Sequence, residues 1–453
     1  MSKDQPSRRR FLSSSLAAAG AIGLASALPA NALEWQDYSA RFNESIDGLL
    51  PTAPVMPDDE AAWQKIAKNY DVTNKIINLE NGYWGIMARP VLAEFRRLNE
   101  FVNRENSYFA RVQISETDRS IRESVANFLN VAVDEIALTR GATESLQALI
   151  GGYNKVRPGD TVLFADLDYG EMKIAMNWLK ERRGAKPVKV NFPEPTQERR
   201  LTEADIVAFY ERSFEANPGT KLLLLTHLNN LTGMVIPVAK IAKLAKERGI
   251  DVILDAAHSV GQIDFKLGEL GCDFIGVNMH KWVGAPIGCG VIYIRKGRVD
   301  VIDTFFGKTP GSTDVLDRID SGTSNFATRM AIPAAIAFHN RIGTAAKEAR
   351  LKYLRNLWVT PARQIKGLTI LAPDDSNMVG ALTSFRFDGA VTAEANLAIA
   401  RMLKDKYGIL TVRRTGPAAG DCIRVTPSIY NSPQDVLKLA NALKSIASMP
   451  KTW

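Results

Sequence analysis

Two ionisable residues that follow separate apolar segments could form one reactive centre. Asp255 closes the apolar run 251–255, and Lys281 comes three residues after the apolar run 272–278. Each run is typical of a buried parallel strand, and parallel strands bring their carboxyl ends to one edge of a sheet. A lysine amine can form a Schiff base with pyridoxal phosphate, while a carboxylate keeps its pyridine nitrogen protonated. The pair therefore indicates pyridoxal phosphate chemistry.

Each of these residues also has a simpler explanation. Taken alone, Lys281 is more readily a surface lysine after a strand, and Asp255 is more readily a capping aspartate. The order of the motifs reverses this preference. His258 follows the acid by three residues, and a Gly-rich turn leads from the lysine into a further apolar run at 290–295.

Strand-length apolar runs alternate with segments of helical periodicity along much of the chain. The run 221–226 is apolar over five or six successive residues, which is typical of a central parallel strand. Repeated strand–helix–strand units predict an α/β fold with right-handed crossovers, in which ligands bind at the carboxyl ends of the strands. The expected strands of this sheet are 136–139, 160–164, 187–191, 221–226, 251–255, 272–278 and 290–295.

The segments Asp255-Ala-Ala-His258 and Asn278-Met-His-Lys281, followed by the Gly-rich strand, resemble class V aminotransferase-fold enzymes, and isopenicillin N epimerase-like proteins in particular. The resemblance extends from about Asn78 to the C-terminus. It implies fold type I, a doubly wound, mostly parallel sheet with a smaller C-terminal α+β domain, and it implies pyridoxal 5'-phosphate and a homodimer. The expected parts are an N-terminal arm (33–75), a large cofactor-binding domain (76–335) and a small domain (336–453).

The resemblance also implies roles for individual residues. Lys281 would form the Schiff base and then act as the base for the substrate Cα proton, and Asp255 would pair with the pyridinium. The segment 140–145 matches the family's phosphate loop, at the start of a helix where free N–H groups attract anions. The other implied cofactor contacts are Ala142 and Thr143 in that loop, Tyr169 stacked on the ring, Asn229 and His258 at the phenolic oxygen, Asn278 and His280 near the phosphate, and Thr323 at the phosphate of a neighbouring subunit. A helix cap, a packed tyrosine or a core histidine would explain several of these residues equally well.

Substrate contacts are expected on the C-terminal side of the chain. Arg424 would bind the substrate α-carboxylate through its planar fork, a geometry that lysine cannot copy. Arg413 and Arg414 are candidates for reading a second acidic group. Asn81 and Tyr83, in a turn that the resemblance places over the active site, are candidates for further contact with the substrate.

Residues 1–32 have the organisation of an export signal. A basic segment, Ser7-Arg-Arg-Arg-Phe-Leu12, precedes the apolar run Leu16–Leu28 and the cleavage-like Ala30-Asn-Ala32. The paired arginines resemble a twin-arginine signal, which predicts export of the folded protein to the periplasm by the twin-arginine machinery. A membrane anchor is the alternative, but the run is shorter than the roughly 20 residues of a spanning helix. No other stretch is apolar enough to span a membrane.

Composition excludes several other functions. The chain has 453 residues and a formal net charge of +8, without a basic run or an alternation of basic and aromatic residues, so nucleic acid is not an expected partner. Its three cysteines, Cys272, Cys289 and Cys422, are irregularly spaced and form neither a disulfide framework nor a zinc motif. No metal site is expected.

The reaction itself stays open at this point. Transamination and epimerisation of a small amino substrate are the expected reactions, and a C–S lyase is the alternative. A cysteine desulfurase is disfavoured, because that reaction needs a cysteine on a mobile loop and Cys422 reads better as a packed residue. Export favours, by analogy, an amino-bearing secondary metabolite such as a siderophore peptide. A cofactor-free scaffold on the same fold is disfavoured by the retained Lys281, Asp255 and Arg424.

Overall fold

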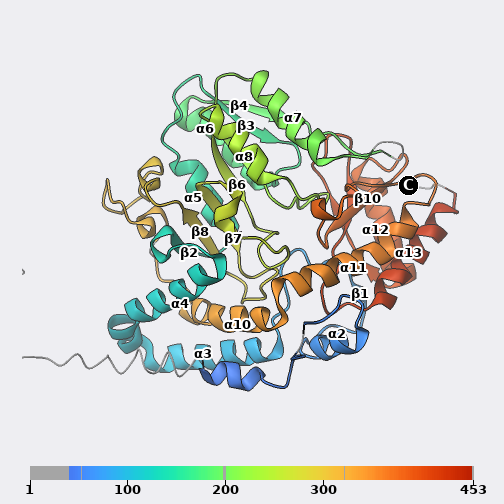
Figure 1. The fold of residues 1–453 in the computed structure, drawn as a ribbon, viewed down its shortest axis with the longest axis horizontal. Helices are drawn as coiled ribbons and strands as arrows, with labels where there is room; N and C mark the ends of the chain where they lie inside the picture. The colour runs from blue at the N-terminus through green and yellow to red at the C-terminus, as the bar shows by residue number, and fades with distance from the viewer. Residues whose placement is uncertain (1–39, 53, 197–199, 321, 451–453) are drawn as a thin grey trace, which may run out of the picture.

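The computed structural model describes residues 40–52, 54–196, 200–320 and 322–450 (Figure 1). The predicted signal peptide, residues 1–32, lies outside these ranges, as does the start of the predicted arm. Within the described ranges, no helix combines the length and the apolar character needed to cross a membrane.

A seven-stranded sheet forms the centre of the larger part of the molecule. Its strand order is β2-β8-β7-β6-β5-β3-β4, and only β8 runs antiparallel to its neighbours. The connection from β7 to β8 spans only residues 279–289, which is too short for the crossover that a parallel pair requires. The predicted α/β fold with a mostly parallel sheet is confirmed. The strands are β2 (Ile136–Thr139), β3 (Thr161–Ala165), β4 (Lys186–Val190), β5 (Thr220–Thr226), β6 (Asp251–Asp255), β7 (Phe274–Asn278) and β8 (Gly290–Ile294).

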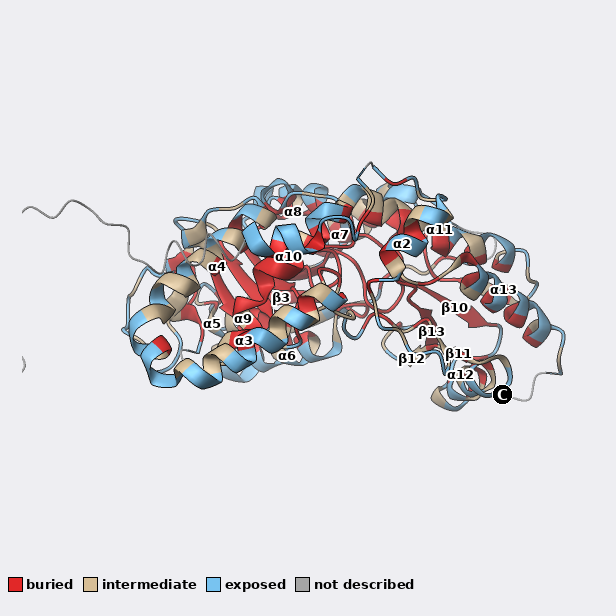
Figure 2. Ribbon diagram, turned by 90° about the horizontal axis from the view of Figure 1, so that it is seen from below, coloured by how far each residue is buried: buried red, intermediate tan, exposed pale blue. Residues whose placement is uncertain are grey.

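Apart from the edge strand β4, the sheet is buried on both faces, as its apolar strands require (Figure 2). Along β5, Leu223 and Leu225 belong to one hydrophobic core, while Leu222 and Leu224 belong to the core on the opposite face. The second core is covered by α5 (Ala142–Gly152) and α6 (Gly170–Arg183). The helices of the first core include α3 (Arg89–Tyr108), α4 (Ile114–Leu129), α7 (Glu203–Glu215), α8 (Val238–Glu247) and α10 (Ile332–Ile342).

A second, four-stranded antiparallel sheet lies in the C-terminal part, with the order β12-β13-β10-β9. Helices pack on it around a separate core, which confirms the predicted α+β character of this part. Its elements are β9 (Leu368–Ile370), β10 (Thr383–Phe387), β12 (Val412–Arg414), β13 (Cys422–Val425), α11 (Thr344–Ala362), α12 (Ala393–Tyr407) and α13 (Pro433–Ala447).

The N-terminal segment joins this second part rather than the large sheet. Strand β1 (Ile77–Asn78) pairs in parallel with β11 (Ile409–Leu410), and Leu79 is buried in the core of the C-terminal part. Upstream, the helix α2 (Glu60–Ala67) contacts α11 through an ion pair between Glu60 and the buried Arg350. Residues 77–80, which sequence analysis assigned to the large domain, thus pack with the C-terminal part.

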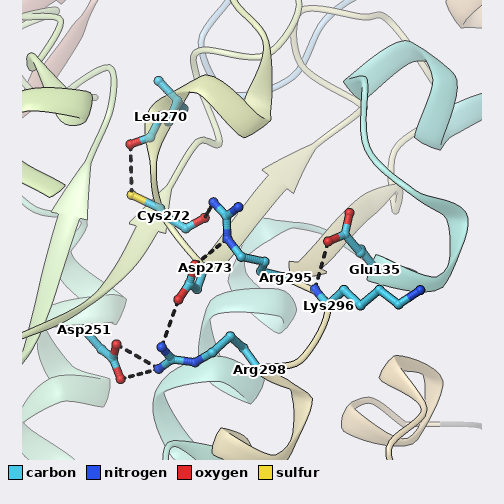
Figure 3. A network of polar contacts seen from close by, with 8 residues as sticks. All are labelled: Glu135, Asp251, Leu270, Cys272, Asp273, Arg295, Lys296 and Arg298. Carbon is cyan, nitrogen blue, oxygen red and sulfur yellow. Dashed lines mark hydrogen bonds and ion pairs between the residues drawn. The ribbon is translucent and has the colours of Figure 1, made fainter. Parts of the chain in front are cut away.

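Ion pairs connect the ends of three strands on the side of the sheet away from the predicted site (Figure 3). Arg298 bonds to Asp251 at the start of β6, with N–O distances of 2.9 and 2.7 Å, and to Asp273 just before β7 at 3.0 Å. Arg295, which follows β8, bonds to Asp273 at 2.5 Å. The network joins the strand ends on this side. At the opposite ends, Asp255 is in register with Gly276, two residues before Asn278.

A glycine allows the closest approach between the two parts. Gly233 has φ +84°, and a Cβ atom there would lie 1.8 Å from the backbone oxygen of Leu382, just before β10. Nearby, Val235 N–H donates to the Met378 oxygen (2.8 Å), and Ser384 N–H donates to the Thr232 oxygen (3.2 Å). The loop after β5 is therefore tied by its backbone to the smaller sheet.

The replacement Gly233→Ala is expected to destabilise the protein more than Gly249→Ala. Both positions have positive φ, which costs a residue with a Cβ roughly 1–2 kcal/mol. Position 249 has no atom within 4 Å of its Cβ, whereas at 233 the clash with Leu382 should add about 1–3 kcal/mol. Thermal unfolding followed by circular dichroism measures the difference. Equal melting temperatures for the two variants would contradict this close contact.

Candidate active site

A cavity of about 470 Å³ lies at the carboxyl ends of the parallel strands. Its wall combines both parts of the molecule: the large sheet and α5 supply one side, and β12 and β13 supply the other. Nine of the predicted site residues line it, namely Ala142, Thr143, Tyr169, Asp255, His258, Asn278, His280, Lys281 and Arg424. Two of the candidates for substrate contact, Tyr83 and Arg414, line it as well. Asn229, Thr323, Asn81 and Arg413 do not.

Lys281 lies in the turn that follows β7. Its Nζ is 2.8 Å from the Nε2 atom of His258, which lies in the turn after β6. The pKa of Lys281 is lowered to about 7, chiefly by burial; the guanidiniums of Arg424 and Arg414 also lower the pKa, and the carboxylate of Asp255 opposes the fall. Near neutral pH a large share of this amine is therefore unprotonated and able to act as a nucleophile or base.

Asp255 is the last residue of β6 and is almost fully buried. Its Oδ1 accepts a hydrogen bond from the Ala257 N–H at 2.9 Å. Burial raises the pKa of this carboxyl group, while the Ala257 N–H and the charge of Lys281 oppose the rise. A buried acid of this kind needs a cationic partner, and a pyridinium nitrogen would be one.

His258 is buried and neutral. Burial lowers its pKa well below the ordinary value, and the neighbouring Lys281, Arg424 and Arg414 lower it further. Its Nδ1 atom is buried without a hydrogen-bond partner among the described residues. Buried polar atoms are normally satisfied, so this atom marks a position where a bound molecule would complete the site.

The start of α5 forms the end of the cavity suited to an anion. Gly141 precedes the helix, and a Cβ atom there would approach Asn278 Oδ1 to 3.2 Å and His280 Cε1 to 3.4 Å. Asn278 Oδ1 already accepts the Ala142 N–H at 2.8 Å, so Asn278 braces this loop. The side chain of Thr143 lies in the first turn of α5, beside the remaining free N–H groups of the helix.

His280 is held against the next strand. Its Nδ1 lies 2.9 Å from the backbone oxygen of Cys289, just before β8, and burial lowers its pKa. Because a carbonyl oxygen can only accept, Nδ1 carries a proton, and the imidazole ring is thereby oriented with its other edge towards the cavity.

The structure corrects the position of the asparagine. The side chain of Asn229 is turned away from the cavity: its Nδ2 donates to the Leu167 oxygen (2.6 Å) and its Oδ1 accepts the N–H groups of Leu231 and Thr232. Asn230 lines the cavity instead, and its Oδ1 is buried without a partner among the described residues. The reason is local, because the loop after β5 turns sharply and adjacent side chains point in different directions.

Thr323 lies in a neighbouring hollow of about 370 Å³ rather than in the main cavity. The two hollows share Arg140 and Glu144 as walls, and these two residues form an ion pair with a distance of 3.0 Å. Thr323 is exposed in the single chain. Its predicted contact across a dimer stays a prediction.

Arg424 lines the cavity but already has a carboxylate partner. Its Nη2 and Nε atoms form a two-point ion pair with the carboxylate of Glu80, in which the Nε–Oε2 distance is 3.3 Å. Its Nη1 donates to the backbone oxygen of Asn230 at 3.0 Å. Sequence analysis missed Glu80, because no local pattern connects residues separated by more than three hundred positions.

The two arginines of β12 have different surroundings. Arg413 forms an ion pair with Asp421. Arg414 lines the cavity, and its Nε is buried without a partner among the described residues. Strand alternation explains the difference, because successive side chains point to opposite faces of the sheet.

Thr226 is a further cavity residue that sequence analysis missed. It ends β5 directly beside Asp255 in the strand register, and its Oγ1 donates to Asp168 Oδ1 at 2.6 Å. Burial raises the pKa of Asp168 to about 7. The end of the apolar run 220–226 was the available signal, since the residue closing a central strand lies at the same edge as Asp255.

These groups fit pyridoxal phosphate as a ligand. The cavity combines a buried lysine amine, a buried carboxylate, the aromatic ring of Tyr169 and a helix start at Gly141, where no side chain blocks access to the helix N–H groups. Unsatisfied buried atoms of His258 and Asn230 remain for polar contacts. Across the described ranges, no group of three or more His, Cys, Asp or Glu residues is placed to hold a metal ion.

Comparison with known proteins agrees with this geometry. Residues 90–439 match the family described as Aminotransferase class-V. The isopenicillin N epimerase of Streptomyces clavuligerus is 24% identical over 408 residues, covering 85% of this chain and 98% of the epimerase.

Solved structures show the same fold at low sequence identity. The cysteine desulfurase of Thermococcus onnurineus NA1 superimposes with a TM-score of 0.71 at 20% identity, covering 88% of this chain and 99% of the desulfurase. A mutant of C-DES with glycine covalently linked to its PLP cofactor superimposes with a TM-score of 0.68 at 21% identity, covering 82% and 97% of the two chains.

The low pKa of Lys281 predicts unusual reactivity at neutral pH. In cofactor-free protein, acetylation of Lys281 by acetic anhydride should follow a pH profile with its midpoint near 7, whereas exposed lysines should react fully only near pH 10. Asp255→Asn should move the midpoint to lower pH, because the carboxylate stabilises the ammonium. Peptide mass spectrometry measures both rates. A midpoint above pH 9 in the wild type would show that the amine is not buried as described.

Proposed function

The chain belongs to the aminotransferase class-V family, and from this premise we propose a pyridoxal 5'-phosphate-dependent enzyme that acts on a small amino substrate by transamination or epimerisation. The observation that carries the proposal is the Lys281 amine, which lies 2.8 Å from a neutral His258 in the cavity that also contains Asp255. A lysine with a pKa of about 7 can both take up and release a proton near neutral pH.

The position of each cavity residue assigns it a role in binding the cofactor or in moving a proton. Pyridoxal phosphate, when bound, condenses with amino groups and draws electrons from the adjacent carbon. Thr143 and the start of α5 would hold the phosphate group, Asp255 would face the pyridine nitrogen, and Tyr169 would cover the ring. Lys281 would hold the cofactor and move the proton at the carbon that bears the amino group, with His258 orienting its amine.

Lyase chemistry is the second candidate. A cysteine desulfurase is among the proteins of similar fold, and C-DES is a cystine C–S lyase. All three cysteines of this chain are buried, and burial raises the pKa of each thiol, that of Cys422 to about 11. A desulfurase that transfers sulfur through an exposed thiol is therefore disfavoured, whereas a C–S lyase needs no such thiol. Release of sulfide from cysteine or cystine tests this alternative.

The purified protein should show a visible absorption band after incubation with pyridoxal phosphate, and Lys281→Ala should abolish the band. Lys240→Ala is the control: Lys240 carries the same amine, but it is exposed and does not line the cavity, so the band should persist. Circular dichroism checks that both variants fold.

The response to added amines then separates the reactions. Production of a keto acid with loss of the band indicates transamination, whereas loss of optical activity with an unchanged band indicates epimerisation. If no band forms in the wild type, or if the band survives in Lys281→Ala, the enzyme proposal is wrong and a cofactor-free scaffold is favoured.

We further propose that the enzyme is exported as a folded homodimer and acts in the periplasm on an amino-bearing secondary metabolite, possible examples being siderophore peptides. The support for export is the arrangement of residues 7–32. Replacement of Arg8 and Arg9 by lysine should leave the protein in the cytoplasm, whereas replacement of the exposed Arg104 and Arg119 by lysine should not change its location. Immunoblots of periplasmic and cytoplasmic fractions measure this. A periplasmic double variant would contradict the twin-arginine route.

A further inference from the structure

We propose that Lys347, which lies outside the cavity, is a positioning residue for Lys281. Its side chain donates a hydrogen bond to the backbone oxygen of Trp282, the residue that directly follows Lys281. This bond fixes the turn from which the Lys281 side chain extends, and so fixes where the Lys281 amine lies. The inference rests on the proposed function, in which that amine holds the cofactor and moves a proton, and it adds a residue that touches neither cofactor nor substrate.

Lys347 is buried to an extent that is unusual for a lysine. It lies near the start of α11, and only 5% of its surface is exposed. Lysines are almost never fully buried unless they are paired. Burial alone lowers the pKa of Lys347 to about 7, and no carboxylate among the described residues opposes the fall. The amine therefore depends on neutral hydrogen-bond partners, and the Trp282 oxygen is one of the two that the described residues supply.

The second partner is His339, near the end of α10. Its Nδ1 atom lies 3.3 Å from the Nζ atom of Lys347, and its Nε2 atom lies 3.0 Å from Oγ1 of Thr344. An ammonium group can only donate, so Nδ1 accepts, and the proton of the neutral ring is on Nε2, which donates to the Thr344 hydroxyl. Burial and then the charge of Lys347 lower the pKa of His339 well below its ordinary value, which keeps the ring neutral. These bonds orient the lysine amine towards the Trp282 oxygen.

The turn that carries Lys281 is held at three successive backbone oxygens. The oxygen of His280 accepts the Gly85 N–H at 2.8 Å, and a Cβ atom at Gly85 would lie 2.0 Å from the oxygen of Lys281. The oxygen of Trp282 is held by Lys347. The first two contacts come from the backbone of Gly85, whereas the third comes from a side chain. A single replacement can therefore release one side of the turn.

Little space remains beside this turn. A hollow of about 20 Å³ borders Lys281, Trp282 and Lys347, together with Tyr70 and Tyr430. Loss of the Lys347 amine would enlarge this hollow and leave the Trp282 oxygen without its donor. Because an unsatisfied buried carbonyl group is unfavourable, the turn would then move to find another donor.

The position of the turn decides the chemistry of the Lys281 amine. Its Nζ atom lies 2.8 Å from Nε2 of His258, and a shift of about 1 Å would exceed hydrogen-bond range. A displaced amine would also be less buried, and burial is the main reason that its pKa is about 7. The charge of Lys347 is not among the causes of that low pKa, so Lys347 acts through the backbone.

The test measures the reactivity of Lys281 after Lys347 has been replaced. In cofactor-free protein, acetylation of Lys281 by acetic anhydride should have its midpoint near pH 7 in the wild type and about one pH unit or more higher in Lys347→Met. Lys347→Arg keeps a donor for the Trp282 oxygen and should bring the midpoint part of the way back. Peptide mass spectrometry measures the midpoints, and thermal unfolding followed by circular dichroism measures the stability of each variant.

Arg355→Met is the matched control. Arg355 is a second buried cation of α11, but its Nε donates at 2.7 Å to Oγ1 of Thr383 in the smaller sheet rather than to the turn. This variant should lower the melting temperature, as Lys347→Met does, and should leave the midpoint of Lys281 near pH 7.

Three results would overturn the inference: an unchanged midpoint in folded Lys347→Met, an equal shift in Arg355→Met, or no recovery in Lys347→Arg. If Lys347→Met does not fold, Lys347→Gln takes its place, because its side chain is one atom shorter than lysine and does not reach the Trp282 oxygen. A midpoint near pH 7 in folded Lys347→Gln would overturn the inference equally. None of these measurements uses pyridoxal phosphate, so the absence of a visible band in the wild type would sink the proposed function alone.

Discussion

The buried amine of Lys281 is the group on which the rest of the site depends. An ammonium ion there is opposed by burial and by two guanidiniums, so its pKa falls to about 7. The backbone around it is held from both sides: Gly85 N–H donates to the His280 oxygen at 2.8 Å, and the Lys347 ammonium donates to the Trp282 oxygen. A lysine on a loose turn would reach water and regain its ordinary proton affinity.

Two contacts hold the C-terminal part beside the cavity. Within that part, Glu80 pairs with Arg424. Between the two parts, the buried Asp166, directly after β3, accepts the N–H of Ala418 in the loop before β13 at 2.8 Å. The cavity wall that carries Arg414 and Arg424 is thereby fixed against the large sheet.

Local patterns in the sequence predicted much of this arrangement. The end of one apolar run at Asp255 and of another before Lys281 placed both residues at one edge of a parallel sheet, because the side-chain alternation and strand direction of such runs are general properties. The side chain of Asn229 is turned away from the cavity and Asn230 lines it instead, since no repeat period governs an irregular loop. Thr323 lies in the adjacent hollow, and its role depends on a second chain.

By itself the sequence determined the type of fold, the ends of the strands and the chemical identity of the groups at those ends, because strand length and apolar periodicity are set by neighbouring residues. Only the tertiary structure decided which charges meet. Glu80 and Arg424 are brought together by the pairing of β1 with β11 and by the bridge from Glu80 to Thr426. Such pairings depend on long-range geometry, which no short stretch of sequence encodes.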